Sequence, residues 1–93
     1  KLPNVLDLDV AVVGQGPMGQ LMNACLSNMG ARHIIGIDLL EDRLKVSPLM
    51  GATATVCNSR EDPVAAVKSI LNGHLPNIVI ECVGHADQQL NLC

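Results

Sequence analysis

One stretch, residues 9–38, constrains the fold more than any other part of the chain. It opens with an apolar run at residues 10–13, turns through Gly-Gln-Gly-Pro-Met-Gly at 14–19, and continues as a helical pattern to Gly30. A second apolar run follows and ends at Asp38. The first run does not alternate with polar residues, as is typical of a strand buried on both faces of a parallel sheet. The stretch predicts a strand, a tight turn, a helix and a second strand.

Each glycine of the turn has its own physical task. Gly14 stands where the chain reverses, Gly16 lets the backbone approach an anion, and Gly19 lets the helix pack closely on the sheet. Pro17 occupies the first helical position, where its missing N–H costs nothing. The free N–H groups at the helix start favour an anion, so the spacing predicts a dinucleotide diphosphate site. The alternative is a glycine turn that only lets a helix pack on a strand.

Asp38 comes about 20 residues after the last glycine of the turn, a distance at which a carboxylate can bind the ribose hydroxyls of an adenosine. A 2′-phosphate at about 4 Å from it would meet a repulsion of roughly 1–4 kcal/mol, and the next residue, Leu39, is not basic. We therefore expect NAD rather than NADP. The alternative is an acid that merely ends a strand in solvent. Arg43 follows five residues later and is either a contact to the adenosine or a solvated helix charge.

The rest of the chain alternates helical and strand patterns. We expect a helix over 39–50 broken at Pro48, with Ser47 as a possible cap of a new short turn, and a helix that begins at Pro63 with Asp62 as N-cap. The other expected elements are strands over 52–57 and 77–82 and a helix over 86–92. This alternation predicts an α/β fold: a Rossmann-type parallel sheet with helices on both faces, truncated to about four strands in the order 3-2-1-4. A cofactor would lie where the strand order reverses, between the ends of strands 1 and 4.

The first helix has an apolar stripe that we expect to face the sheet. Its members recur at helical spacing: Met18, Leu21, Met22, Cys25, Leu26 and Met29. The whole chain contains no Phe, Tyr or Trp, so the core must be aliphatic.

Composition excludes several function classes. The chain has 93 residues and a net charge of −3 without a basic stripe, which argues against nucleic acid as a partner. No apolar run approaches the roughly 20 residues that span a bilayer, and no leader pattern is present. The four cysteines form no C-x-x-C motif, so we expect reduced thiols, no zinc site within this chain and a cytoplasmic location.

No catalytic constellation is visible in the sequence. There is no nucleophile–base pair and no metal-ligand set, so we assign no catalytic residue. Glu81 and His85 lie near the expected cleft but have plain structural explanations first. Hydride transfer asks little of the protein beyond positioning, because the nicotinamide carries the chemistry.

Four segments, at residues 12–19, 30–44, 50–53 and 78–84, resemble the coenzyme-binding domain of the zinc-containing, medium-chain alcohol dehydrogenases. That family includes threonine and polyol dehydrogenases. The Gly-x-Gly-Pro-x-Gly form and the Asp-x4-Arg step are fairly specific to it, and the resemblance extends from Val10 to about Leu90.

The resemblance implies a set of cofactor contacts. Five residues would line the diphosphate: Gly14, Gly16, Pro17, Met18 and Gly19. Asp38 would hold the adenosine ribose, Arg43 would lie against the adenosine, and Val83 would touch the cofactor near the end of the fourth strand. The parent enzyme would oxidise a small secondary alcohol or polyol by hydride transfer to NAD, with zinc held only in a catalytic domain that this chain lacks.

The chain also departs from the family. It has no zinc-ligand domain and no fifth and sixth strands, and Pro48 falls in a family helix that is usually uninterrupted. We therefore expect residues 1–93 to be a partial NAD-binding domain, with 1–7 as an incoming linker, that is inactive alone. The strand at 77–82 would then have a bare edge, which favours self-association. Two alternatives remain: an NAD-sensing regulatory module, as in channel regulatory domains or redox repressors, and a zinc-free quinone reductase.

Overall fold

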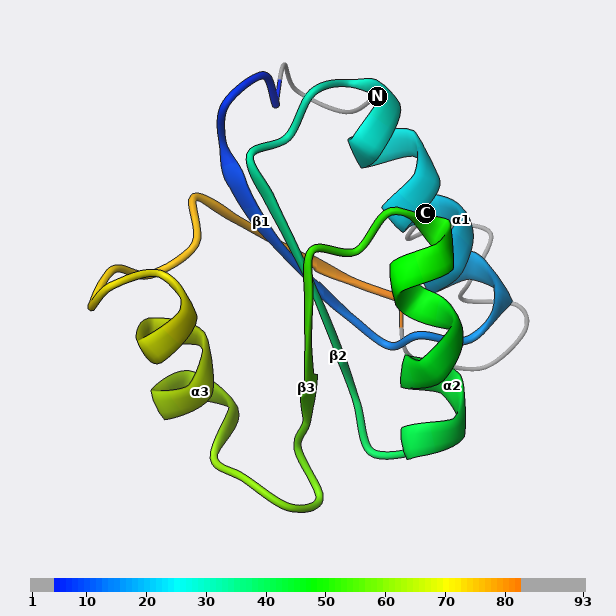
Figure 1. Cartoon of the computed structure of the whole chain (residues 1–93), viewed down its shortest axis with the longest axis vertical. Coiled ribbons are helices and arrows are strands. Elements are labelled where there is room, and N and C mark those ends of the chain that lie inside the picture. Colours follow the sequence, from blue (N-terminus) through cyan, green and yellow to red (C-terminus); the bar gives the residue numbers. More distant parts are fainter. Residues whose placement is uncertain (1–4, 83–93) are drawn as a thin grey trace.

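The protein, described here from a computed structural model over residues 5–82, is a parallel sheet with helices on both faces (Figure 1). In chain order its elements are β1 (Asp9–Val13), α1 (Pro17–Asn28), β2 (His33–Asp38), α2 (Glu41–Val46), the 3₁₀ helix η1 (Ser47–Met50), β3 (Ala54–Cys57), α3 (Pro63–Ile70) and β4 (Ile78–Glu81). The strand order β3-β2-β1-β4 confirms the predicted order. The helix expected over 86–92 lies outside the described residues.

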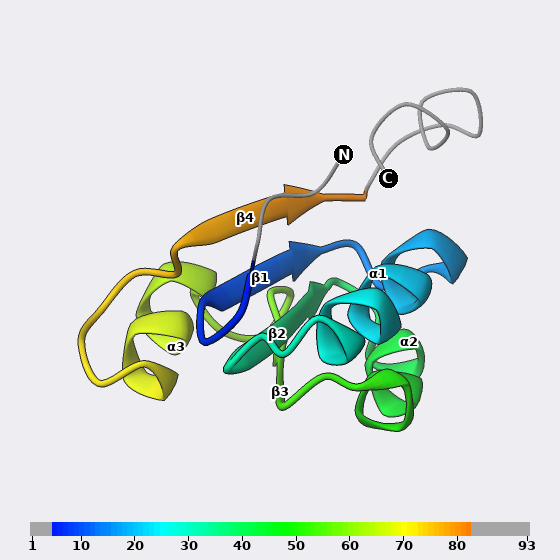
Figure 2. The ribbon, with the colours of Figure 1, turned by 90° about the horizontal axis from the view of Figure 1, so that it is seen from above.

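Strand order decides which face each helix covers. From β1 the chain adds β2 and then β3 on one side, and it returns after β3 to place β4 on the other side of β1. Because parallel crossovers are right-handed, this reversal sends α3 to the face opposite α1 and α2 (Figure 2). The carboxyl ends of β1 and β4 lie side by side, with Val13 opposite Glu81, as expected for a switch point.

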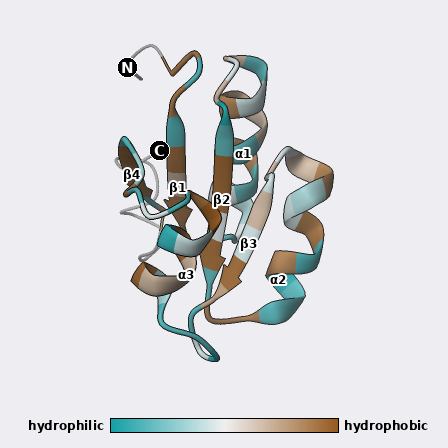
Figure 3. Ribbon diagram, turned by 60° about the vertical axis from the view of Figure 1, so that its left-hand side comes forward, coloured by the Kyte–Doolittle hydropathy of each residue, from teal (hydrophilic) through white to brown (hydrophobic). Residues whose placement is uncertain are grey.

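The central strands β1 and β2 are buried on both faces by aliphatic side chains, which explains their unbroken apolar runs. Figure 3 shows hydrophobic residues along these strands. Val10, Val12 and Ile34 pack toward α1 together with Met22 and Leu26. On the other face, a second cluster packs toward α3: Ala11, Ile35, Ile37, Val56, Val67 and Leu71.

The predicted apolar stripe of α1 is wrong at two positions. Leu21 is 54% exposed and Cys25 is exposed, whereas Gln20 and Asn23 are buried. The cause is a polar contact between α1 and the joint of α2 with η1, in which Gln20 Nε2 bonds to Ser47 Oγ and lies 2.9 Å from the Arg43 carbonyl oxygen. The helix boundaries agree better with prediction: Pro17 begins α1, and Gly30 follows its end with a φ of +83°.

The second helical segment breaks where Pro48 predicted. The α-helix ends at Val46, and residues 47–50 continue as a 3₁₀ turn. Ser47 is not the cap, however, because Val46 takes that position and the Ser47 side chain turns inward. Asp62 caps α3 as predicted, since its Oδ2 accepts a 3.0 Å hydrogen bond from the Ala65 N–H.

The cysteine prediction is partly wrong. Cys25 and Cys57 carry free thiols, but the buried Cys82 is disulfide-bonded. Among residues 5–82, no helix has the length and apolar character needed to cross a membrane.

A buried carboxylate fastens the amino ends of the strands. Asp9 is 5% exposed, and its two oxygens accept hydrogen bonds from Arg32 Nε at 3.0 Å and Nη2 at 2.7 Å. His33 Nδ1 lies 2.7 Å from the same carboxylate, and Asn77 Oδ1 accepts the Asp9 N–H at 2.9 Å. Hydrogen bonds from Arg32 outweigh burial and, with His33, lower the pKa of Asp9 from 3.8 to about 2.

This lowered pKa predicts acid sensitivity. Unfolded Asp9 takes up a proton near its usual pKa of 3.8, before the folded form does near 2. The stabilisation is therefore complete above about pH 5 and is lost as the pH falls to about 2. Asp9→Asn should lower the free energy of unfolding at pH 7 by about 1–2 kcal/mol and flatten its decline in acid. Urea unfolding between pH 7 and pH 2.5 measures this; equal declines in both proteins would contradict it.

The outer edge of β4 predicts self-association. Within the described part of the chain, β4 pairs with β1 on one side only, and Val79 on it is 61% exposed. Such an edge can pair with a second chain. We expect the sedimentation coefficient of the 93-residue chain to rise with concentration, and Val79→Lys to weaken association by about tenfold or more. Val64→Lys, at a 55% exposed position on α3, is the control. A wild-type monomer at every concentration would refute the prediction.

Candidate functional site

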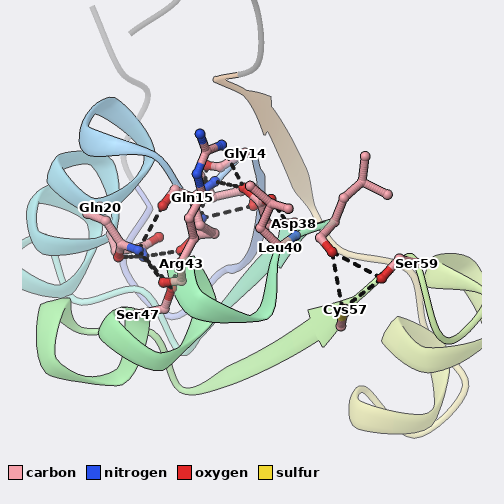
Figure 4. A network of polar contacts seen from close by, with 12 residues as sticks. Gly14, Gln15, Gln20, Asp38, Leu40, Arg43, Ser47, Cys57 and Ser59 are labelled. Atoms are coloured by element: carbon pink, nitrogen blue, oxygen red, sulfur yellow. Dashed lines mark hydrogen bonds and ion pairs between the residues drawn. The ribbon is translucent and has the colours of Figure 1, made fainter.

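Asp38 and the glycine turn face each other at the carboxyl ends of β2 and β1 (Figure 4). Asp38 is 8% exposed, and its Oδ2 accepts a 2.7 Å hydrogen bond from the Gln15 N–H inside the turn. Its Oδ1 accepts a 2.9 Å hydrogen bond from the Leu40 N–H. The carboxylate is therefore fixed against the turn, and the alternative of an acid ending a strand in solvent is wrong.

Asp38 stays ionised at neutral pH despite its burial. Burial by itself raises the pKa of this carboxyl, but the hydrogen bonds from the Gln15 and Leu40 N–H groups and the nearby Arg43 cation together lower it. A carboxylate has about four acceptor directions. Two are taken by short backbone hydrogen bonds, so acceptor capacity remains for hydroxyl groups of a ligand.

Arg43 brings a cation to the same place. From α2, its Nη1 lies 3.5 Å from Asp38 Oδ2, and its side chain is 51% exposed. A Cβ built on Gly16 would stand 3.8 Å from the same Nη1. The Arg43 guanidinium thus lies beside both the Asp38 carboxylate and the glycine turn. The structure therefore brings together Asp38 and Arg43, which the sequence indicated separately.

The three glycines of the turn are needed for three different reasons. Gly14 has a φ of +98°, which favours a residue without Cβ. A Cβ on Gly19 would overlap the carbonyl oxygen of Gly14, so α1 can approach the turn only at a glycine. Gly16 has an ordinary extended backbone with φ −75°, and its missing Cβ leaves open space instead.

Two hollows adjoin these groups. The first, about 410 Å³, is walled mainly by aliphatic residues with Asp38 at its edge: Val13, Gly14, Ile37, Asp38, Leu39, Leu40, Arg43 and Asn58. The second, about 350 Å³, is lined by Gln15, Gly16, Pro17, Gln20, Asp42, Arg43 and Val46. Arg43 lines both. The first, aliphatic hollow suits a sugar with its base. The second hollow lies against the start of α1, where an anion is favoured.

Other predicted positions are less informative. Met18 lies in the first turn of α1, and Val83 and His85 lie outside the described residues. Glu81 ends β4 with an exposed side chain beside Val13. Among residues 5–82, no group of three His, Cys, Asp or Glu side chains could hold a metal ion. This part of the chain therefore does not fit a zinc site.

The sequence analysis missed the polar residues that support the turn. Gln15, Gln20 and Ser47 are buried and hydrogen-bonded to one another. Gln15 occupies a variable position of the glycine pattern, and Gln20 lies outside the apolar stripe that the sequence predicted for this helix. The one available signal was Pro48, whose helix break places Ser47 at the joint.

Sequence comparison identifies relatives among dehydrogenases and reductases. Residues 17–92 match the zinc-binding dehydrogenase family. The chain is 40% identical over 75 residues to an L-threonine 3-dehydrogenase of Bacillus subtilis (strain 168), covering 81% of this chain and 22% of the relative. It is 35% identical over 75 residues to a D-xylulose reductase of Scheffersomyces stipitis, covering 81% and 21%. The chain thus spans about a fifth of the length of these curated relatives.

Solved structures agree with the sequence matches, and both indicate one family. The alcohol dehydrogenase TADH from Thermus sp. ATN1 superposes with a TM-score of 0.79 at 32% identity, over 94% of this chain and 25% of that one. A putative zinc-binding dehydrogenase from Sinorhizobium meliloti 1021, bound to NADP, gives 0.79 at 28% identity, over 97% and 28%. The resemblance read from the glycine turn and the Asp-x4-Arg step is confirmed, and the chain belongs to the zinc-binding dehydrogenase family.

Proposed function

We propose that residues 9–58 bind the adenosine and diphosphate portions of NAD, within an oxidoreductase whose coenzyme-binding domain this chain partly supplies. One observation carries the proposal. The Asp38 carboxylate is held by the Gln15 N–H at the edge of a hollow, beside the bare backbone of Gly16. This arrangement offers acceptors for sugar hydroxyls next to donors for an anion.

The proposed site works through positioning. The first N–H groups of a helix have no partner within the helix, so the start of α1 can donate to a diphosphate. Gly16 allows that anion to approach, and Arg43 adds a positive charge at the same place. The adenosine would lie in the aliphatic hollow with its ribose hydroxyls on Asp38. Gly14, Pro17, Met18 and Gly19 complete the proposed diphosphate contacts, and Val83, beyond residues 9–58, is proposed to touch the cofactor near the end of the fourth strand.

We infer that the whole enzyme oxidises a secondary alcohol or polyol. This rests on the likeness to proteins named as a threonine 3-dehydrogenase and a xylulose reductase. The bound nicotinamide would accept the hydride. Because residues 5–82 contain no metal-ligand cluster, any zinc that polarises the alcohol must be held outside them. The role of this part of the chain is to hold and orient the coenzyme, and we expect the chain alone to be inactive.

The cofactor preference yields a first test at Asp38. We expect the wild-type chain to bind NAD at least about tenfold more tightly than NADP, because the carboxylate repels a 2′-phosphate by roughly 1–4 kcal/mol. Asp38→Asn removes the charge, so it should weaken NAD binding and bring the NAD-to-NADP affinity ratio close to one. Isothermal titration of both dinucleotides measures these affinities.

The control for this test is Asp62→Asn. It makes the same chemical change at the N-cap of α3, where Asn caps a helix as well as Asp does. It should leave the NAD-to-NADP ratio unchanged. Equal binding of the two dinucleotides by the wild-type chain would refute the assigned preference.

Two neighbouring glycines separate folding from binding. At Gly16 a Cβ would meet only the Arg43 side chain, at 3.8 Å, so Gly16→Ala should keep the wild-type melting temperature. It should nevertheless weaken NAD binding by about tenfold or more, because the methyl group obstructs the diphosphate. At Gly19 the Cβ would overlap the Gly14 carbonyl, so Gly19→Ala should lower the free energy of unfolding by about 1–3 kcal/mol. Calorimetric melting and titration distinguish the two; a Gly16→Ala chain with undiminished NAD affinity would count against the site.

A further inference from the structure

The Gln15 side chain is buried inside the glycine turn rather than exposed on it. It is 1% exposed, and all of its hydrogen-bonding capacity is used within the protein (Figure 4). Its Oε1 accepts from Ser47 Oγ at 2.7 Å and from Asn23 Nδ2 at 2.6 Å. Its Nε2 donates to the carbonyl oxygens of Val12 at 3.1 Å and Gly14 at 3.2 Å. The residue between two glycines is therefore anchored on both sides.

The strand beneath the turn leaves room for this side chain. Gly36 lies within β2, and a Cβ built on it would stand only 2.7 Å from Gln15 Cδ. A glycine inside a strand weakens that strand and often marks a close approach by another group. Here the Gln15 amide makes the close approach, so the glycine at position 36 of β2 leaves the space that the Gln15 side chain of the turn occupies.

The break in the second helix supplies the partner of Gln15. Because α2 ends at Val46, Ser47 stands at the joint with its side chain fully buried. Its hydroxyl donates to Gln15 Oε1 at 2.7 Å and accepts from Gln20 Nε2 at 3.1 Å. Gln20 Nε2 also lies 2.9 Å from the backbone oxygens of both Gln15 and Arg43. The network thus connects the glycine turn, α1 and the backbone of Arg43.

We propose that Ser47, Gln15 and Gln20 are positioning residues for the diphosphate subsite. They fix the backbone of the glycine turn relative to Arg43 and Asp38 before a dinucleotide arrives. Ordering a loop on binding costs free energy that a preorganised loop does not lose at that step. The inference rests on the proposed function, and it assigns a role to the helix break at Pro48 that cofactor contact alone does not explain.

Ser47→Ala is the sharpest test, because Ser47 is fully buried and does not line either hollow. We expect the full 93-residue variant to bind ADP and NAD about fivefold to tenfold more weakly than wild type. Adenosine should lose less affinity than ADP does, because it lacks the diphosphate, even though its hollow shares Gly14 and Arg43 with the turn. A purely structural role would weaken all three ligands alike.

Thr53→Val provides a control away from the turn. It deletes a hydroxyl whose oxygen accepts from the Ile34 N–H at 3.0 Å, at the opposite end of the sheet. We expect it to leave the ADP-to-adenosine affinity ratio at the wild-type value. Gln15→Met, which removes the amide at similar length, should repeat the Ser47→Ala result.

A measurement without ligand completes the test. The Gln15 N–H donates to Asp38 and the Gln20 N–H donates to the Gly16 carbonyl, so both amides report on the turn. Their hydrogen exchange should become about fivefold faster or more in Ser47→Ala and should not change in Thr53→Val. Wild-type exchange and wild-type ADP affinity in Ser47→Ala would overturn the inference. Absence of NAD and ADP binding by the wild-type chain would instead overturn the proposed function, and exchange at the two amides would still decide whether Ser47 positions the turn.

Discussion

The hydrogen bond from the Gln15 N–H to the Asp38 carboxylate, 2.7 Å long, is the contact on which the site depends. It joins the turn after β1 to the last residue of β2, 23 residues later in the chain. A backbone donor and an ionised acceptor make a stronger hydrogen bond than two neutral groups. The bond also fixes the Asp38 carboxylate relative to the start of α1, the two groups that we propose bind the sugar hydroxyls and the diphosphate of a dinucleotide. Everything else near the turn either keeps this bond in place or leaves space beside it.

Keeping the turn in place imposes costs elsewhere in the domain. Gly14 has a positive φ, and Gly19 and Gly36 are glycines because their neighbours leave no room for a Cβ. Within residues 5–82, Asn23 Oδ1 is buried and has no hydrogen-bond partner, which is unfavourable in a protein interior. The two aliphatic clusters on either side of the sheet offset these costs through apolar burial. A purely structural βαβ unit would have no need of such a turn, so its cost is itself an argument for binding.

Local patterns were sufficient for the parts of the fold that depend on nearest neighbours in the chain. The apolar runs located β1, β2 and β4, and Asp62 with Pro63 located the start of α3. Asp38 was proposed as a site residue because the glycine turn has a known distance to its acidic partner. Spacing alone left Arg43 open, and only the Asp-x4-Arg step of the family resemblance indicated it. The Gln15–Ser47 contact could not be found, because its two residues are 32 positions apart, Gln15 stands at a variable position of the glycine pattern, and Ser47 was expected only as a helix cap. Leu21 and Cys25 were assigned to the core for the same reason, since an apolar pattern does not reveal a buried polar partner.

The two buried aspartates differ in how much of their acceptor capacity the described part of the chain uses. Both have a lowered pKa, and both lie at the end of a strand. Asp9 accepts two hydrogen bonds from Arg32 and lies 2.7 Å from His33, so protein groups satisfy nearly all of its acceptor capacity. Asp38 has two short backbone bonds, and its only cation among the described residues stands 3.5 Å away and half exposed. A ligand hydroxyl can therefore still bind to Asp38, and Arg43 is free to turn toward an anion. The same residue type thus stabilises the sheet at its amino end and is available for binding at its carboxyl end.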